Sequence, residues 1–215
     1  MKRLKSILVS LAVMVLLSCS SDPVFHGMTN QQKENYARAV SGEYRGTYAV
    51  VYSDGRSDTK MVKMEGAQVS ISDQSAQSVF FRDFPINRLS LVVKDPALAE
   101  ALASQPNIDL TATYRFLDLQ DNGDVNWGCN DFAVPLTLHV GGSDCHLLLK
   151  FSNAYFYHLT KENLDAGTPF ANHGSITLRF DGIYEGSTLI EDFSIWQGEN
   201  EVFLVLFQFA TNVPH

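Results

Sequence analysis

Residues 134–159 hold the side chains best suited to recognising a ligand. They include two imidazoles, His139 and His146, the amine of Lys150, and the phenols of Tyr155 and Tyr157. Aromatic rings can stack on a sugar, a cation can hydrogen-bond an anion, and two imidazoles can contribute to a metal site. These residue types therefore point to binding chemistry on one surface.

Two predicted hairpins would bring these side chains together. A turn at Gly142-Ser143 places His139 across from His146, and a turn at Ser152-Asn153 places Lys150 across from Tyr155. Alternation then adds Tyr157, Thr137, Leu148 and Leu159 to the same face. The opposite, core face would collect Val134, Leu136, Leu138, Val140, Cys145, Leu147, Leu149, Phe151, Ala154 and Phe156, with His158 as a hydrogen-bonded core histidine.

An ordinary solvated face is the alternative interpretation, because antiparallel sheets often have one wet side. Two histidines without a nearby carboxylate make an incomplete metal site, so no metal is expected. We call His139, His146, Lys150, Tyr155 and Tyr157 the predicted face.

The two cysteines that follow the N-terminal region suggest a disulfide. Cys129 and Cys145 form an even pair, and neither belongs to a Cys-x-x-Cys motif. Closing this loop would contribute about 3 kcal/mol to stability. Two buried thiols are the alternative.

The acidic residues give no complete catalytic or calcium pattern. Counting from Asp118, an EF-hand loop requires Glu at its twelfth position, where the chain has Cys129, so Asn122-Gly123 predicts a type I′ turn instead. Glu191 and Asp192 are adjacent on a strand pattern and point to opposite faces. The sequence has no nucleophile elbow, zinc-protease motif or phosphate loop, which favours a non-enzymatic protein without a cofactor.

The period of the hydrophobic pattern, together with capping and turn residues, predicts the helices and strands that position these residues. Thr29 and Gln32 form a capping box for a helix over 31–40, and Asp95 and Pro96 begin a second helix that runs to residue 102. Residues 53–56, 181–182 and 197–200 are predicted turns, and 161–173 is a predicted loop. Strands are predicted at 44–52, 57–64, 68–72, 79–84, 89–93, 111–119, 125–129, 132–140, 145–151, 154–159, 176–180, 183–185, 188–196 and 202–209.

Roughly a dozen short strands and two short helices indicate an all-β fold. The turn spacing is typical of a single antiparallel sandwich or barrel-like domain over 29–215. Because residues 202–207 are apolar at every position, that strand is expected to be central and covered on both faces. Tyr44-Arg45-Gly46-Thr47-Tyr48 resembles the first strand of calycin-type barrels, with Tyr48 where that family has tryptophan.

The N-terminus predicts an anchor. Lys2, Arg3 and Lys5 precede an apolar run that is too short to span a bilayer, which is typical of a signal peptide over 1–18. The run ends in Leu16-Leu17-Ser18-Cys19, which resembles the lipobox of bacterial lipoproteins. That resemblance implies acylation of Cys19 and a lipid-anchored tether over 19–28. Together with the all-β body, it resembles the uncharacterised outer-membrane lipoproteins of Bacteroidetes.

The anchor and the charge define the expected partners. The whole chain has a formal net charge of −8, and loss of three basic leader residues brings the mature chain to −11, which argues against nucleic acid. Ser20 follows the lipidated position, and in the lipoprotein family this implies export to the outer membrane, on its periplasmic face or at the cell surface. The membrane is then a partner through the N-terminal lipid.

Three functions fit this sequence. The first is a lipid-anchored binding or assembly module of the cell envelope, with an envelope protein or a glycan as its ligand. The second is a calycin-like barrel that carries a small apolar ligand, and the third is a hydrolase with an unrecognised site. An empty interior cavity would favour the second function over the first.

Overall fold

A computed structural model describes residues 27–53, 59–74, 77–170, 174–197, 200–203 and 205–211. The predicted leader, Cys19 and most of the predicted tether lie outside the described residues, as does most of the predicted turn at 53–56. Within the described ranges, no helix is long and apolar enough to cross a membrane.

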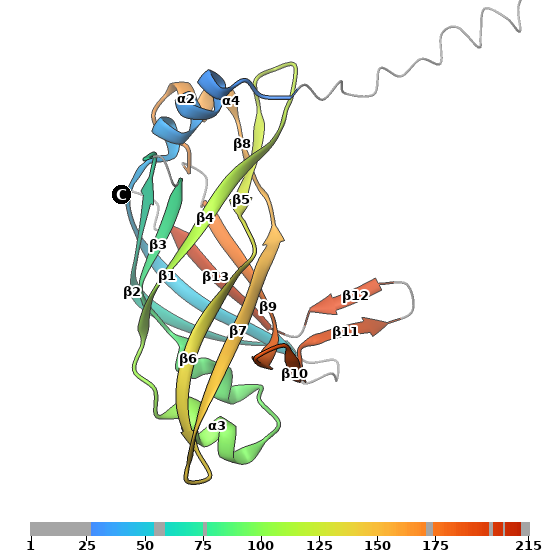
Figure 1. Cartoon of the computed structure of the whole chain (residues 1–215). Helices are drawn as coiled ribbons and strands as arrows, with labels where there is room; N and C mark the ends of the chain where they lie inside the picture. Colours follow the sequence, from blue (N-terminus) through green and yellow to red (C-terminus); the bar gives the residue numbers. More distant parts are fainter. Residues whose placement is uncertain are drawn as a thin grey trace, which may run out of the picture.

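Most of the described chain forms one antiparallel sheet, which confirms the predicted all-β fold. The sheet curls into a half-barrel, with α2 and α4 at one end and α3 at the other (Figure 1). The helices are α2 (Asn30–Val40), the 3-10 helix η1 (Ile86–Leu91), α3 (Pro96–Ala103) and α4 (Lys161–Asp165). The strands are β1 (Gly42–Ser53), β2 (Thr59–Ser72), β3 (Ser78–Phe84), β4 (Ile108–Leu119), β5 (Val125–Cys129), β6 (Phe132–Val140), β7 (Ser143–Tyr155), β8 (Tyr157–Leu159), β9 (Ser175–Glu185), β10 (Thr188–Asp192), β11 (Ser194–Gln197), β12 (Asn200–Phe203) and β13 (Val205–Thr211).

The strand order is β6-β7-β9-β13-β1-β2-β3-β4-β5-β8, with β10 added to β9 and β11 paired with β12. Only Phe156 separates β7 from β8, although these strands lie near opposite ends of that order. One run of chain therefore reaches both ends of the curled sheet. A Cβ added to Gly128 of β5 would lie 2.7 Å from Asn153 Oδ1 of β7, so the lack of a side chain at this glycine permits the close approach.

Aromatic rings fill the inside of the curl. Phe84 of β3 stacks on Phe207 of β13 with ring centroids 4.8 Å apart, and it meets Phe151 of β7 at 5.9 Å. These three strands are not neighbours in the sheet, so their rings meet across its interior. Trp127 and Phe170, 5.5 Å apart, belong to a second group of rings with Tyr114 and Tyr157.

Both predicted helix starts are confirmed. Gln32 N donates to Thr29 Oγ1 at 3.2 Å, and Thr29 N donates to Gln32 Oε1 at 2.9 Å, which completes the capping box of α2. At α3, Leu98 N donates to Asp95 Oδ1 at 2.8 Å. Both helices begin where side chains satisfy free backbone groups.

Three predicted strands have a different structure. Residues 89–93 fall largely in η1, where the buried side chains of Ile86 and Leu89 lie three residues apart, the period of a 3-10 helix. Residues 59–64 and 68–72 are not two strands, because β2 is continuous from Thr59 to Ser72. Gly66 has a positive φ of 80°, and a bulge near it shifts the register against β1 without ending the strand.

Four further predictions for the C-terminal half differ from the structure. Residues 161–173 contain α4, whose Thr160 Oγ1 accepts a bond from Asn163 N. Asp181-Gly182 is a bulge within continuous β9 and not a turn. Residues 188–196 divide at buried Phe193 into β10 and β11, and residues 202–203 belong to β12. The remainder, β13, lies between β9 and β1, which confirms the prediction of a central strand.

Candidate functional site

The turn between β6 and β7 lies one residue earlier than predicted. Gly141 and Gly142 both have positive φ angles, 59° and 89°, as a two-residue hairpin turn of type I′ requires. Consequently Val140 pairs with Ser143, and His139 lies opposite Asp144. His146 lies opposite Thr137, so the predicted pairing of the two histidines is wrong.

Each histidine has its own neighbour. His139 Nδ1 lies 2.9 Å from Asp144 Oδ1, and both side chains are about two-thirds exposed. His146 Nδ1 lies 3.1 Å from Thr137 Oγ1. Among the described residues, no group of three or more histidine, cysteine, aspartate or glutamate side chains is placed to hold a metal.

The aromatic neighbour of Lys150 is Tyr184 of β9. Lys150 Nζ lies 3.7 Å from the centroid of the Tyr184 ring, which makes a cation–π contact. Tyr184 pairs with Leu148, the residue two positions before Lys150 on β7. The sequence gives no signal for this contact, because it depends on β9 lying beside β7.

The second predicted hairpin does not form. Strand β7 continues through Ser152 and Asn153 to Tyr155, so Lys150 does not face Tyr155 and Leu148 does not face Tyr157. Tyr155 pairs with Thr177 and is 60% exposed on the outer face.

The break at Phe156 shifts the side-chain alternation by one residue. Tyr157 therefore points inward, with its ring centroid 5.4 Å from that of Phe170, and burial raises its pKa. Leu159 is fully buried, whereas His158, predicted in the core, is exposed. The predicted face thus keeps four of its five residues on the outside and loses Tyr157.

His158 joins a polar network around Asp124 that the sequence did not reveal. Asp124 Oδ2 lies 3.1 Å from His158 Nε2 and accepts a bond from Asn122 Nδ2 at 2.8 Å, while its Oδ1 accepts from Lys161 N at 2.8 Å. Burial acts to raise the pKa of Asp124, but these hydrogen bonds and the charge of His158 outweigh it and lower the pKa. The carboxylate ties the turn after β4 to β8 and to the start of α4.

That turn is not type I′, because Gly123 has a positive φ of 86° and Asn122 does not. Gly123 N donates to Gln120 O, and Gln120 N donates to Asp124 O. This pattern is a type I turn followed by a bulge, in which only the glycine needs left-handed backbone.

The convex outer face carries an apolar strip. Met61, Val51 and Leu206 lie in one cross-strand row over β2, β1 and β13, on the side away from the core. Met61 is 52% exposed, and Val51 and Leu206 are partly exposed. We call these three residues the outer strip.

Polar side chains border the outer strip. Its row continues to Arg179 of β9 and Ser152 of β7, which both hydrogen-bond to Asp181. In the next row, Lys63 and Gln208 lie on either side of Ala49.

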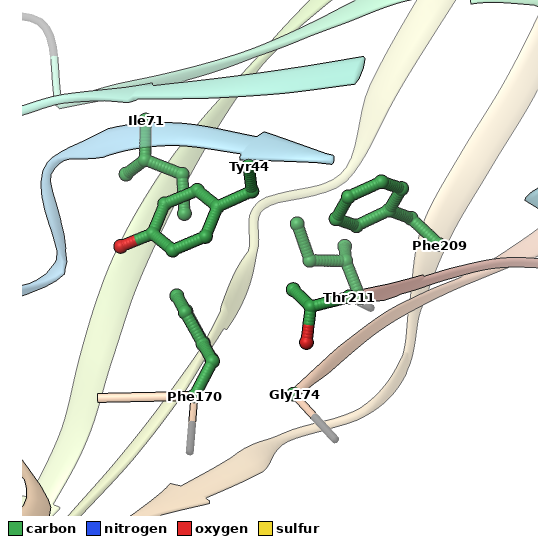
Figure 2. Close-up of a pocket in the computed structure, with 7 residues that line it drawn as sticks. Tyr44, Ile71, Phe170, Gly174, Phe209 and Thr211 are labelled. Carbon is green, nitrogen blue, oxygen red and sulfur yellow. The ribbon is translucent and has the colours of Figure 1, made fainter. Parts of the chain in front are cut away.

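Among the described residues, a narrow apolar crevice lies near the end of β13 (Figure 2). Its empty space, open solvent included, is about 170 Å³, below the roughly 300 Å³ at which small-molecule pockets usually begin. Tyr44 and Phe170 lie edge to face on one side of it, with ring centroids 5.0 Å apart. The lining residues are Tyr44, Ile71, Phe170, Gly174, Ile176, Phe209 and Thr211.

The two cysteines do not form the predicted disulfide. Both are free thiols, on β5 and β7, and Cys129 is fully buried while Cys145 is partly exposed. Burial raises the pKa of the Cys129 thiol to about 12. Cys129 fits the alternative interpretation, in which the cysteine is a buried thiol in the core.

Comparison with known proteins gives one family. The model described as "Domain of unknown function (DUF4840)" matches residues 39–169, which is more than half of the chain. The match spans β1 to α4 and includes every residue of the predicted face. No curated protein and no solved structure gives a match.

Proposed function

We propose that this chain, which belongs to the DUF4840 family, is a lipid-anchored, non-enzymatic binding or assembly module of the bacterial cell envelope. The anchor is supported by Leu16-Leu17-Ser18-Cys19 at the end of a short apolar run behind three basic residues. On the lipoprotein resemblance, Cys19 carries the lipid, and the following residues tether the sheet to the outer membrane.

One observation supports the binding role. Side chains pack together on the inner face of the sheet, whereas apolar side chains on the outer face are exposed. Rings from β3, β7 and β13 meet across the interior, and the crevice beside β13 is small. On the outer face, in contrast, Met61 is 52% exposed and lies in one row with the partly exposed Val51 and Leu206. Exposed apolar side chains that lie together on a sheet are typical of an interaction surface.

The polar part of this outer face adds specificity to the proposed surface. Lys150 is held over the Tyr184 ring, and His146 is oriented by Thr137. Side chains fixed in this way lose little conformational entropy when a partner binds. A glycan or an envelope protein fits such a surface better than a ligand that must be enclosed.

The anchor is tested by labelling cells with an alkyne analogue of palmitate. We expect the full-length chain to take up the label and to fractionate with the outer membrane. Cys19→Ser should abolish the label and release the chain from membranes, whereas the matched control Cys145→Ser should keep both. Unchanged labelling of Cys19→Ser would refute the proposed anchor.

A further inference from the structure

The turn between β4 and β5 contains the one Asn-Gly pair of the chain, Asn122-Gly123. Glycine has no Cβ, so its backbone nitrogen can approach the side-chain carbonyl of the preceding asparagine closely. In that reaction a bond forms between Gly123 N and Asn122 Cγ, and the side-chain NH2 leaves with the proton of Gly123 N as ammonia. Water then opens the cyclic imide at either carbonyl, which leaves aspartate or isoaspartate at position 122.

The folded turn holds the reacting atoms in other hydrogen bonds. Asn122 Oδ1 accepts from Asp124 N at 3.0 Å, and Asn122 Nδ2 donates to Asp124 Oδ2 at 2.8 Å. Gly123 N, the attacking atom, donates to Gln120 O at 2.8 Å. These bonds must break before the ring can close, because Gly123 N has to turn from Gln120 O toward Asn122 Cγ.

Two helices that are distant in the sequence hold the same turn. Tyr36 of α2 donates its hydroxyl to Gly123 O at 3.0 Å. The side chain of Lys161, in α4, packs on Gly123, since a Cβ added to this glycine would lie 2.7 Å from Lys161 Cδ. Both helices lie at the same end of the sheet (Figure 1). Tertiary contacts therefore restrain the Asn-Gly pair in addition to the hydrogen bonds within the turn.

From these contacts, we infer that Asn122 is a modification site, at which loss of ammonia and addition of water give aspartate or isoaspartate, and that the folded turn slows this conversion. The product does not fit the same turn. A carboxylate at position 122 would lie against the carboxylate of Asp124, where Nδ2 and Oδ2 are now 2.8 Å apart, and like charges this close repel. Conversion should therefore loosen the turn from β8 and α4. The modification requires neither the proposed anchor nor a binding partner.

The rate of conversion is measured on the purified full-length chain in mildly alkaline buffer. Peptide mass spectrometry follows the replacement of the side-chain NH2 by OH at position 122. We expect the folded wild type to convert at least about tenfold more slowly than the same chain in guanidinium chloride, because folded chains must first open locally. Equal rates in the two conditions would overturn the inference, as would a denatured chain that stays unconverted.

Two variants loosen the turn from different sides. Asp124→Ala removes the acceptor of Asn122 Nδ2, and Tyr36→Phe removes the hydroxyl that bonds Gly123 O but keeps the ring. Each should speed conversion in the folded chain about fivefold, the factor that one lost hydrogen bond gives in a local opening equilibrium. The matched control Phe84→Leu lowers stability from the core and should convert at nearly the wild-type rate. If Phe84→Leu speeds conversion as much as the two turn variants, global unfolding controls the rate and the inference is wrong.

The effect of the product is measured on Asn122→Asp, which reproduces one of the two products. Its urea midpoint at neutral pH should lie below that of the wild type, and the difference should shrink in acid, where protonation removes the repulsion between the carboxylates. Asn35→Asp is the matched control, because it adds the same charge on α2 and keeps the oxygen that accepts from Gln31. A neutral-pH midpoint of Asn122→Asp equal to that of the wild type would contradict the loosening of the turn.

Discussion

Replacing Phe84 by alanine should open the curl of the sheet. Phe84 is 1% exposed, and its ring contacts four other rings, those of Tyr48, Phe81, Phe151 and Phe207. A buried Phe→Ala change usually costs about 3–5 kcal/mol, and each lost ring pair adds about 0.5–1.5 kcal/mol to what area alone predicts. We therefore expect a loss near the upper end, about 5 kcal/mol.

Phe80→Ala is the matched control, because Phe80 lies on the same strand but is half-buried under the guanidinium of Arg82, 4.9 Å from its ring. It should cost about 1 kcal/mol. Urea unfolding followed by tryptophan fluorescence measures both variants, because Trp127 is buried in the folded chain. If Phe84→Ala does not fold, Phe84→Leu should give a smaller, measurable loss. If Phe84→Ala costs no more than Phe80→Ala, the rings do not hold the curl together.

Three further substitutions or measurements test other contacts. Asp124→Ala should lower the free energy of unfolding by about 2–3 kcal/mol at pH 7, because Asn122, His158 and the backbone N–H of Lys161 lose the carboxylate that they contact. The folded-state pKa of Asp124 is lowered. The stability difference between the wild type and Asp124→Ala should therefore be full above the ordinary aspartate pKa of about 3.9 and should disappear as the pH falls through the folded-state pKa. A stability difference that persists in acid would contradict this prediction. Gly46→Ala should cost about 3 kcal/mol in the same urea assay, since its Cβ would lie 1.9 Å from Ala210 O, whereas Gly27→Ala, with nothing within 4 Å, should be neutral. Cys129 should resist iodoacetamide in the folded chain and react only in denaturant, as peptide mass spectrometry can show.

Local signals in the sequence were the most reliable guides to this fold. The capping box at Thr29 and the Asp95-Pro96 start depend on side chains within three residues of one another, so the sequence contains everything that decides them. The β6–β7 hairpin shows where this reliability ends. Because side chains alternate with period two, moving the pairing by two residues kept Leu138 and Leu147 on the core face but changed the partners of both histidines.

The rest of the candidate site depends on contacts that are distant in the sequence. Tyr184 reaches Lys150 only because β9 lies beside β7. Tyr157 and His158 exchanged faces because one residue, Phe156, breaks the strand and shifts the alternation. A single irregular residue leaves almost no trace in a hydrophobic pattern, so neither outcome could be read from the sequence.

The apolar run at 202–207 connects the sequence to the outer strip. A strand that is apolar on both sides predicts cover on both sides, and the structure supplies the inner cover, since Val205 and Phe207 are buried in the core. Leu206 points the other way and remains partly exposed beside Val51. The sequence pattern therefore predicts that a second surface packs against Leu206 on the outer face of the sheet. This is the physical reason to expect the partner of the proposed module on the convex side of the sheet.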